Sequence, residues 1–286
     1  MNKTPEEIKA ILEQFTIPFF HLEKRFPLLP GKANRKAEAA LLGISEEELK
    51  SFRNNISENS KQGALELLKE DEIIDCMDSL PLDGSETIAV IGDSITEDGQ
   101  GWFEILKQVL ELSVEKADFT FINAGLGEQT TSEALRRLDR DVLIHKPDWV
   151  FVALGTFDAQ RLNIVPDRTI TPLSETWENL ESIQNIISEY VSNHIIWITP
   201  SPVISELLTE NPLYEFTINE EDLQQVRQLV AGKDGVIIDS LGSRMGKEGP
   251  EAWHYIADGL HHSLTGHMNT ARLVIKKLAE SEVTVD

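Results

Sequence analysis

The stretch TIAVIGDSIT, residues 87–96, decides the fold. Its first half is almost entirely apolar, as expected for a strand of a parallel sheet that is covered on both faces. A glycine and an aspartate then lead to Ser94. In open parallel sheets, ligands bind at the carboxyl ends of the strands. The stretch therefore predicts a buried strand, and it places the hydroxyl of Ser94 at the edge of the sheet where a functional site is expected.

Four further apolar runs resemble the first, and longer amphipathic segments lie between them. Strands that alternate with helices predict a doubly wound sheet, because parallel strands need crossover connections. We therefore predict that residues 84–286 form one α/β domain, in which a five-stranded parallel sheet lies between two layers of helices. The other strands are expected at residues 119–122, 149–154, 195–198 and 236–238, and helices at residues 102–112, 132–144 and 173–191.

Residues 1–83 are expected to form a preceding, all-helical region. Thr4 and Ser45 each begin a capping box with a glutamate three residues later, and apolar residues follow at helical spacing. Residues 39–49 resemble a helix-turn-helix, but the second helix opens with three glutamates, which would repel DNA phosphates. We interpret the region as a structural helix pair that packs on the α/β domain, shades its entrance or mediates a homo-oligomer.

The composition excludes several classes of partner. The 286 residues include 26 Lys and Arg against 49 Asp and Glu, a formal charge of −23. So acidic a surface repels nucleic acid and anionic lipid, and we expect neither as a partner. The single cysteine excludes an intrachain disulfide. No signal peptide and no run of 18 apolar residues occur in the sequence, so we expect a cytoplasmic protein.

Residue types that carry hydrolytic chemistry follow the strand ends. Ser94 follows the first strand, and Asp258 and His261 lie three residues apart near the C-terminus. A serine, a histidine and a carboxylate are the nucleophile, the general base and the orienting group of a catalytic triad. Ser94 alone would be read as a helix cap, and the Asp-x-x-His spacing alone is common by chance. Together they predict an active site.

Three segments of the chain resemble the sequence blocks of the GDSL/SGNH hydrolases. They are Gly92-Asp93-Ser94, Asn123-Ala124-Gly125 and Asp258-Gly259-Leu260-His261, which occur in the family's order between roughly residues 86 and 280. The resemblance implies a flavodoxin-like α/β/α sandwich. It also implies a lipase-like esterase that hydrolyses carboxylic esters of small or short-chain acyl groups, with a small-molecule substrate and with no metal or organic cofactor.

The resemblance also implies roles for individual residues. Ser94 would be the nucleophile, His261 the base and Asp258 the carboxylate that orients the base. The backbone N–H groups of Ser94 and Gly125 would form part of the oxyanion hole. Asn123 would shape the loop that begins with the second segment, Asn123-Ala124-Gly125, on the substrate side of the site; this loop is called the second-block loop below.

The family has a further block after the third strand, and here this chain departs from the family pattern with Gly155-Thr156-Phe157-Asp158. The family usually has Gly-x-Asn-Asp, whose asparagine donates to the oxyanion, whereas this chain has Phe157 at that position. Loss of one such donor typically costs about 10²–10³ in turnover. We therefore expect a slower or more specialised esterase, in which Phe157 offers an apolar wall to the substrate. Gln160 and Asn163 are candidate replacement donors.

The same residues are compatible with two other functions, and the sequence disfavours two more. An acyltransferase, or a deacetylase of a sugar or another hydroxyl compound, would use the same triad, and a catalytically retired fold would serve as a binding module. A dinucleotide site is disfavoured, because Thr130 stands where the glycine-rich fingerprint needs glycine or alanine. Metal binding is disfavoured, because no second cluster of ligands accompanies the histidines near Asp258.

Overall fold

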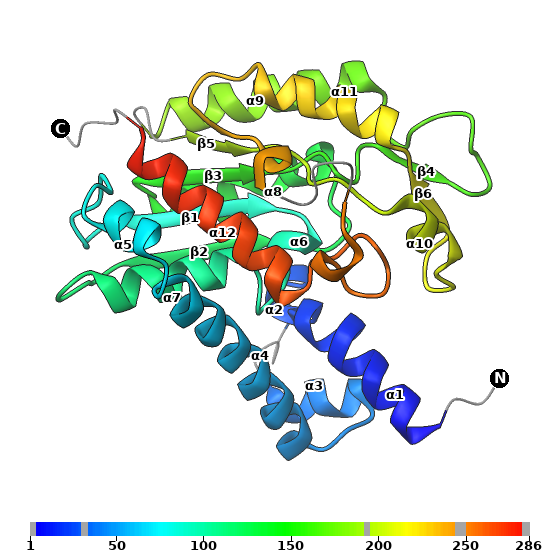
Figure 1. Cartoon of the computed structure of the whole chain (residues 1–286). Coiled ribbons are helices and arrows are strands. Elements are labelled where there is room, and N and C mark those ends of the chain that lie inside the picture. Colours follow the sequence, from blue (N-terminus) through cyan, green and yellow to red (C-terminus); the bar gives the residue numbers. More distant parts are fainter. Residues whose placement is uncertain (1–3, 30–33, 192–194, 244–249, 282–286) are drawn as a thin grey trace.

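The computed structural model describes residues 4–29, 34–191, 195–243 and 250–281, and its centre is a five-stranded sheet (Figure 1). Every pairing in this sheet is parallel. The predicted doubly wound parallel sheet is therefore confirmed. In spatial order the strands are β2 (Thr120–Gly125), β1 (Thr87–Gly92), β3 (Trp149–Ala153), β5 (Ile195–Ile198) and β7 (Val236–Ile238).

The strand order creates a crevice at the carboxyl end of β1. From β1 the chain passes to β2 on one side, and it later returns as β3 on the other side. Gly92 at the end of β1 is level with Gly125 of β2 and with Ala153 of β3. Ligands bind in sheets of this kind where the winding direction reverses. Ser94 follows β1 at this point.

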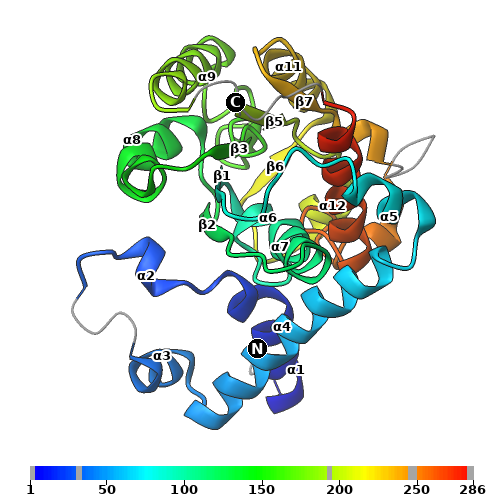
Figure 2. The same cartoon turned by 90° about the vertical axis from the view of Figure 1, so that its left-hand side faces the viewer.

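Helices cover both faces of the sheet, as Figures 1 and 2 show. Side chains alternate between the faces of β1, so that Ile88 and Val90 enter one hydrophobic core while Ala89 and Ile91 enter the other. Each core is completed by helices that turn their apolar stripes inward. The first core receives α7 (Trp102–Ser113) and α12 (Leu264–Ala279), and the second receives α8 (Thr131–Asp141), α9 (Leu173–Ser188) and α11 (Glu220–Ala231).

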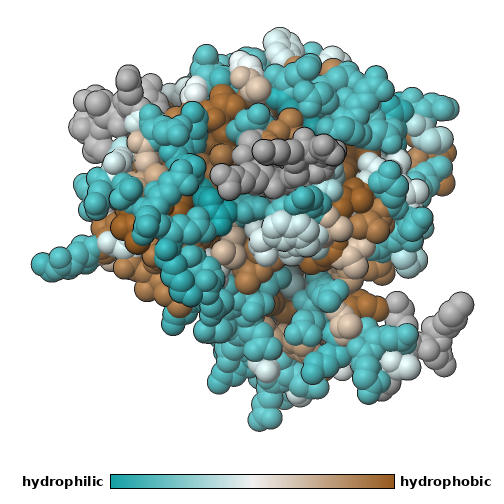
Figure 3. Space-filling view, in the orientation of Figure 1, coloured by the Kyte–Doolittle hydropathy of each residue, from teal (hydrophilic) through white to brown (hydrophobic). Residues whose placement is uncertain are grey.

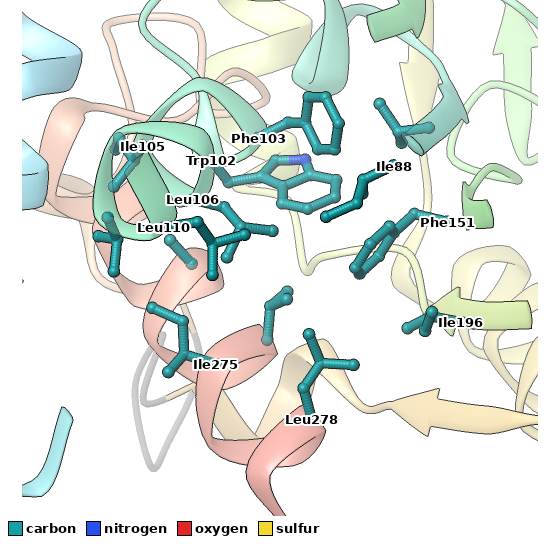
Figure 4. Packing of buried hydrophobic residues seen from close by; sticks show 14 of the residues in the cluster. Ile88, Trp102, Phe103, Ile105, Leu106, Leu110, Phe151, Ile196, Ile275 and Leu278 are labelled. Atoms are coloured by element: carbon teal, nitrogen blue, oxygen red, sulfur yellow. The ribbon is translucent and has the colours of Figure 1, made fainter. Parts of the chain in front are cut away.

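The aromatic residues of the first core anchor the segment that carries Ser94. Figure 4 shows Trp102 and Phe103, at the start of α7, beside Phe151 of β3. Their ring centroids lie 5.8 Å and 6.3 Å from that of Phe151. Burial of a side chain such as Phe stabilises a fold by about 1.5–3 kcal/mol. The chain between β1 and α7 is therefore held firmly at both ends.

The N-terminal region is helical, as predicted, and both expected capping boxes are formed at Thr4 and Ser45. The helix after Ser45 is long and runs unbroken to Leu67. Gly63 allows this long helix to approach α7 and α12, because a Cβ there would lie 3.2 Å from side-chain atoms of Ile105 and Leu264. The helices of the region are α1 (Pro5–Ile11), α2 (Leu22–Arg25), α3 (Arg35–Leu42), α4 (Glu46–Leu67) and α5 (Asp71–Met77).

A small antiparallel sheet, which the sequence analysis did not predict, lies beyond the carboxyl end of β3. It consists of β4 (Gln160–Leu162) and β6 (Phe216–Ile218). The short helix α10 (Ser205–Glu210) lies beside β6. These elements enclose a separate hydrophobic cluster that includes Phe157 and Leu260. Leu260 connects the cluster to the loop that carries Asp258 and His261.

The surface agrees with the acidic composition. On the face shown in Figure 3, hydrophilic residues cover most of the area. Among the described residues, no helix is both long and apolar enough to cross a membrane.

Candidate active site

Ser94 lies at the carboxyl edge of the sheet, where the sequence placed it. It is the first residue of the short helix α6 (Ser94–Glu97), which follows β1 directly. Asp93 caps this helix, because its Oδ1 accepts a hydrogen bond of 3.0 Å from the backbone N–H of Ile95. The side chain of Ser94 is therefore presented from a rigid strand-to-helix turn.

The structure brings Ser94, His261 and Asp258 into one hydrogen-bonded chain. The Oγ atom of Ser94 lies 2.8 Å from Nε2 of His261, although the two residues are 167 positions apart. Nδ1 of the same imidazole lies 2.7 Å from Oδ2 of Asp258. This order of hydroxyl, imidazole and carboxylate is the geometry of a nucleophile, its general base and the group that orients the base.

Asp258 is fully buried, and several donors hold its carboxylate. The backbone N–H groups of Leu260 and His261 each donate to Oδ1 at 2.9 Å. The hydroxyl of Tyr214 donates to Oδ2 at 3.0 Å. Tyr214 precedes β6 and was missed by the sequence analysis, since no motif marks it. Gly259 turns this loop with a φ of 68°, a conformation that favours glycine.

The environment favours a charged pair between His261 and Asp258. Burial lowers the pKa of His261, but the hydrogen bond and charge of Asp258 outweigh it, so the pKa lies above its ordinary value. Burial raises the pKa of Asp258, but the hydrogen bonds from His261 and from two backbone N–H groups bring it below its ordinary value. A base of this kind readily accepts a proton from Ser94 and is stabilised once charged.

The second-block loop differs in detail from the sequence-based expectation. The backbone N–H of Gly125 donates to Oδ1 of Asn123 at 2.9 Å, so an oxyanion would have to compete with this hydrogen bond. The expected place of Gly125 in the oxyanion hole stays a prediction. Glycine is required there for another reason: a Cβ would lie 2.5 Å from the backbone nitrogen of Glu97. Gly125 thus lets β2 lie against α6.

Asn123 connects β2 to both neighbouring helices. Its Nδ2 donates to the carbonyl of Thr96 at 3.0 Å and to the carboxylate of Glu104 at 3.2 Å. Its Oδ1 accepts from Gly125 and from the ammonium group of Lys24. Both Nδ2 and Oδ1 of Asn123 are therefore hydrogen-bonded within the protein, which agrees with its expected role of shaping the loop.

The backbone N–H of Ser94 remains the candidate oxyanion donor. It belongs to the first turn of α6, where backbone N–H groups have no partner within the helix. No acceptor for it occurs in the ranges of the chain that the structure describes. The N-terminal end of a helix also carries a partial positive charge, which favours a developing oxyanion.

Phe157 does not line the site, and the expected apolar wall is corrected. Its side chain has no exposed surface and packs in the cluster below β4 and β6, with its ring centroid 6.0 Å from that of Phe216. Gln160 lies in β4 and is nearly buried, and Asn163 follows that strand in an exposed position. Neither side chain is hydrogen-bonded to the triad in the described structure, so a replacement donor among them stays a prediction.

Among the described residues, no group of three or more His, Cys, Asp or Glu side chains has a metal-binding arrangement. His262 and His267, near the triad, have ring centroids 5.2 Å apart. His267 is hydrogen-bonded to Asp98 through Nε2 at 3.2 Å.

Comparison with known proteins gives a family and several relatives. Residues 90–268 match the sequence profile of the GDSL-like lipase/acylhydrolase family. An acetylxylan esterase from Geobacillus stearothermophilus is 22% identical over 227 residues, which cover 70% of this chain and 96% of that protein. The uncharacterized lipoprotein YqeF from Bacillus subtilis is 36% identical over 86 residues, which span 27% of this chain and only 33% of that protein.

Solved structures share the fold. The lipase/acylhydrolase from Enterococcus faecalis superposes with a TM-score of 0.55 at 25% identity, covering 68% of this chain and 95% of that one. A catalytic mutant of the acetylxylan esterase from Geobacillus stearothermophilus superposes with a TM-score of 0.57 at 20% identity, covering 70% and 96%. In both comparisons the matched part amounts to about two thirds of this chain and nearly all of the other.

Proposed function

The chain belongs to the GDSL-like lipase/acylhydrolase family of carboxylic ester hydrolases, and from this premise we propose that it is a serine esterase whose catalytic triad is Ser94, His261 and Asp258. The observation that carries the proposal is the pair of hydrogen bonds at 2.8 Å and 2.7 Å that joins the three side chains.

The reaction proceeds in two halves through an acyl-enzyme. Oγ of Ser94 attacks the ester carbonyl carbon while Nε2 of His261 takes the hydroxyl proton. When the tetrahedral intermediate collapses, the bond to the alkoxy group breaks, and His261 returns the proton to the departing alcohol. Water then attacks the acyl group with His261 again as the base, which releases the carboxylic acid and restores Ser94. Asp258 keeps the imidazole in the tautomer that this cycle needs.

Stabilisation of the oxyanion begins with the backbone N–H of Ser94. The position of Phe157 supplies no side-chain donor, and the N–H of Gly125 is bonded to Asn123. Each missing donor costs about 2.7–4 kcal/mol of transition-state stabilisation. We therefore expect modest turnover on unactivated esters and clear activity on esters with a good leaving group.

Small acyl groups are the proposed substrates. A relative that aligns over 96% of its length is named an acetylxylan esterase, which supports an acetyl or similarly short acyl group. Acetylated sugars and other acetylated hydroxyl compounds are therefore the first native candidates to examine.

The test is hydrolysis of p-nitrophenyl acetate, butyrate and octanoate by the wild type and by Ser94→Ala. We expect kcat/KM to fall from acetate to octanoate, and kcat to fall by several orders of magnitude in the variant, since loss of a triad serine costs on the order of 10⁶. Ser113→Ala, an exposed serine at the end of α7, is the matched control and should retain activity. Equal hydrolysis by wild type and Ser94→Ala would reject Ser94 as the nucleophile.

Two further assays separate the alternatives. Acetyl transfer to an added alcohol or sugar in preference to water would identify an acyltransferase. A fluorophosphonate that labels the wild type but not Ser94→Ala would exclude a retired fold, because labelling requires an activated serine.

A further inference from the structure

The N-terminal region sends one segment, residues 17–25, into the active site. This segment contains a short 3-10 turn (Ile17–Phe19), which contacts α6, and the helix α2. Its first contact is a backbone hydrogen bond, in which the N–H of Gly99 donates to the carbonyl of Pro18 at 3.1 Å. Pro18 is buried, so the segment lies on the α/β domain as part of its packing.

A buried carboxylate at the end of α6 anchors the middle of the segment. Glu97 is 1% exposed, and its Oε1 lies 3.2 Å from Nδ1 of His21. Its Oε2 accepts the backbone N–H of Gly127 at 2.5 Å. A buried carboxylate is costly unless it is hydrogen-bonded, and here one of its partners comes from the N-terminal region. The segment and the second-block loop are therefore connected through Glu97.

Lys24 attaches the end of the segment to β2. Its ammonium group donates to Oδ1 of Asn123 and to the carbonyl of Gly125, both at 3.3 Å. Burial lowers the pKa of Lys24, and the carboxylates of Glu97 and Glu104 oppose this effect. The lysine is therefore occupied by the protein and is not the group that a ligand would meet.

Phe19 covers the proposed catalytic base. Its ring centroid lies 4.7 Å from that of His261, with the two rings inclined at 49°. An aromatic ring at this distance packs directly on the imidazole and excludes water from one side of it. The segment thus forms one side of the space in which the substrate must lie.

Arg25 is the residue of the segment that is free to bind a ligand. It is exposed, and in the described parts of the chain it has no hydrogen bond or ion pair through its side chain. Its Nη2 lies 3.1 Å from the point that a Cβ on Gly127 would occupy, and the same point is 4.0 Å from Cβ of Ser94. The guanidinium group therefore lies in the same part of the site as the side chain of Ser94, on the side of the loop at Gly127. The nearby carboxylate of Glu97 is already bound by His21 and Gly127.

We propose that residues 17–25 form one wall of the substrate cleft and that Arg25 binds a carboxylate group carried by the ester substrate. A guanidinium group binds a carboxylate through two parallel hydrogen bonds, which gives both attraction and orientation. A single negative charge suits the site better than a phosphate dianion, because Glu97 and the exposed Glu128 lie in the same loop region. This assignment rests on the proposed esterase function and names its substrate class: small esters that bear a carboxylate.

The first test compares matched esters. On the acyl side, mono-p-nitrophenyl succinate is compared with p-nitrophenyl butyrate, and on the alcohol side 4-acetoxybenzoate is compared with its methyl ester. For each pair we take the ratio of kcat/KM for the anionic ester to kcat/KM for the neutral ester. In at least one pair, this ratio should fall roughly fivefold or more in Arg25→Gln, and it should fall further in Arg25→Glu. Arg35→Gln, an exposed arginine on α3, should leave both ratios unchanged. Ratios that stay unchanged in both Arg25 variants overturn the assignment.

The second test does not depend on turnover. In the Ser94→Ala background, calorimetry measures the Kd of the anionic and of the neutral ester in both pairs. If the anionic ester binds more tightly than the neutral ester, and if this difference is lost in the Ser94→Ala/Arg25→Gln double variant, the carboxylate site is supported. This holds even if the chain hydrolyses neither ester. Equal affinities that the second substitution does not change reject it, even if Ser94-dependent hydrolysis of neutral esters is found. The two proposals can therefore fail separately.

Discussion

The hydroxyl of Tyr214 lies 3.0 Å from Oδ2 of Asp258, and this oxygen is also the one that lies 2.7 Å from Nδ1 of His261. Two donors thus share one carboxylate oxygen, while two backbone N–H groups occupy the other. Tyr214 completes the hydrogen bonding of a carboxylate that has no access to water. It is thereby a positioning residue for the proposed triad, and it lies outside all of the segments that resemble the family's sequence blocks.

Replacement of Tyr214 by phenylalanine is expected to lower kcat/KM about tenfold, the equivalent of one charge-assisted hydrogen bond. The aromatic packing on Phe216 is retained, since only the hydroxyl is removed. Asp258 then acts more strongly on His261, so the pKa of His261 should rise. The acidic limb of the plot of kcat/KM against pH should therefore move to higher pH. A drop in activity without this movement would indicate a structural role only.

Replacement of Asp258 by asparagine should move the acidic limb in the opposite direction. Activity requires neutral His261, and in the wild type Asp258 keeps the pKa of His261 above its ordinary value despite burial. Without the carboxylate, burial dominates and the pKa falls, so the limb appears at lower pH. The rate itself should fall by about 10⁴, because the preferred tautomer is lost. The check is a pH series with p-nitrophenyl acetate; a limb that stays in place would contradict the assignment of this pKa to His261.

Replacement of Gly125 by alanine should impair activity through the backbone of α6. The new Cβ would lie 2.5 Å from the nitrogen of Glu97 and 2.6 Å from the carbonyl carbon of Thr96, so the helix that begins at Ser94 must shift. Displacement of a catalytic group by about 1 Å can cost on the order of 10² in rate. Gly232→Ala is the control, because a Cβ there would make only ordinary contacts at 3.5 Å or more. Kinetics and thermal unfolding of both variants provide the measurement, and wild-type activity in Gly125→Ala would refute the close contact.

Replacement of Asp93 by asparagine should stabilise the protein at neutral pH. Burial raises the pKa of Asp93 to about 6, although Ile95 and Thr156 donate hydrogen bonds to it. A carboxyl group whose pKa is raised on folding destabilises the fold as pH rises from its unfolded value through its folded value. Asparagine lacks this dependence. The difference in the free energy of unfolding, variant minus wild type, should therefore grow by about 2 kcal/mol between about pH 4.5 and about pH 7.5. Urea unfolding measures it, and a difference that is constant with pH would show that Asp93 does not titrate in this range.

The sequence predicted the sheet and the three residues of the hydrogen-bonded chain because both depend on local sequence patterns. An apolar strand followed by Ser94 fixes where the hydroxyl lies, and the Asp-x-x-His spacing brings Asp258 and His261 together within one loop. The division at residues 83 and 84 stays a prediction. The N-terminal segment nevertheless contacts the site directly through Phe19 and His21.

The details that the sequence did not predict depend on side-chain packing between distant segments. Phe157 occupies the expected block, but the sheet formed by β4 and β6 provides an apolar cluster that buries it. The N–H of Gly125 is used by Asn123, a local hydrogen bond that the motif does not reveal. Tyr214 lies in an irregular segment and Phe19 in a short 3-10 turn, and neither segment has a periodic pattern, so only the folded structure brings them to His261.

The long separation between Ser94 and His261 also sets an order of events on the ribosome. The two residues are 167 positions apart, and at about 5–20 residues per second the histidine is added roughly 8–30 s after the serine. During that interval the nascent chain carries Ser94 without the histidine that we propose as its base, while the segment that packs on the imidazole has already been made. The proposed triad therefore cannot form before His261 has been added to the chain, so a shorter nascent chain lacks the proposed esterase activity.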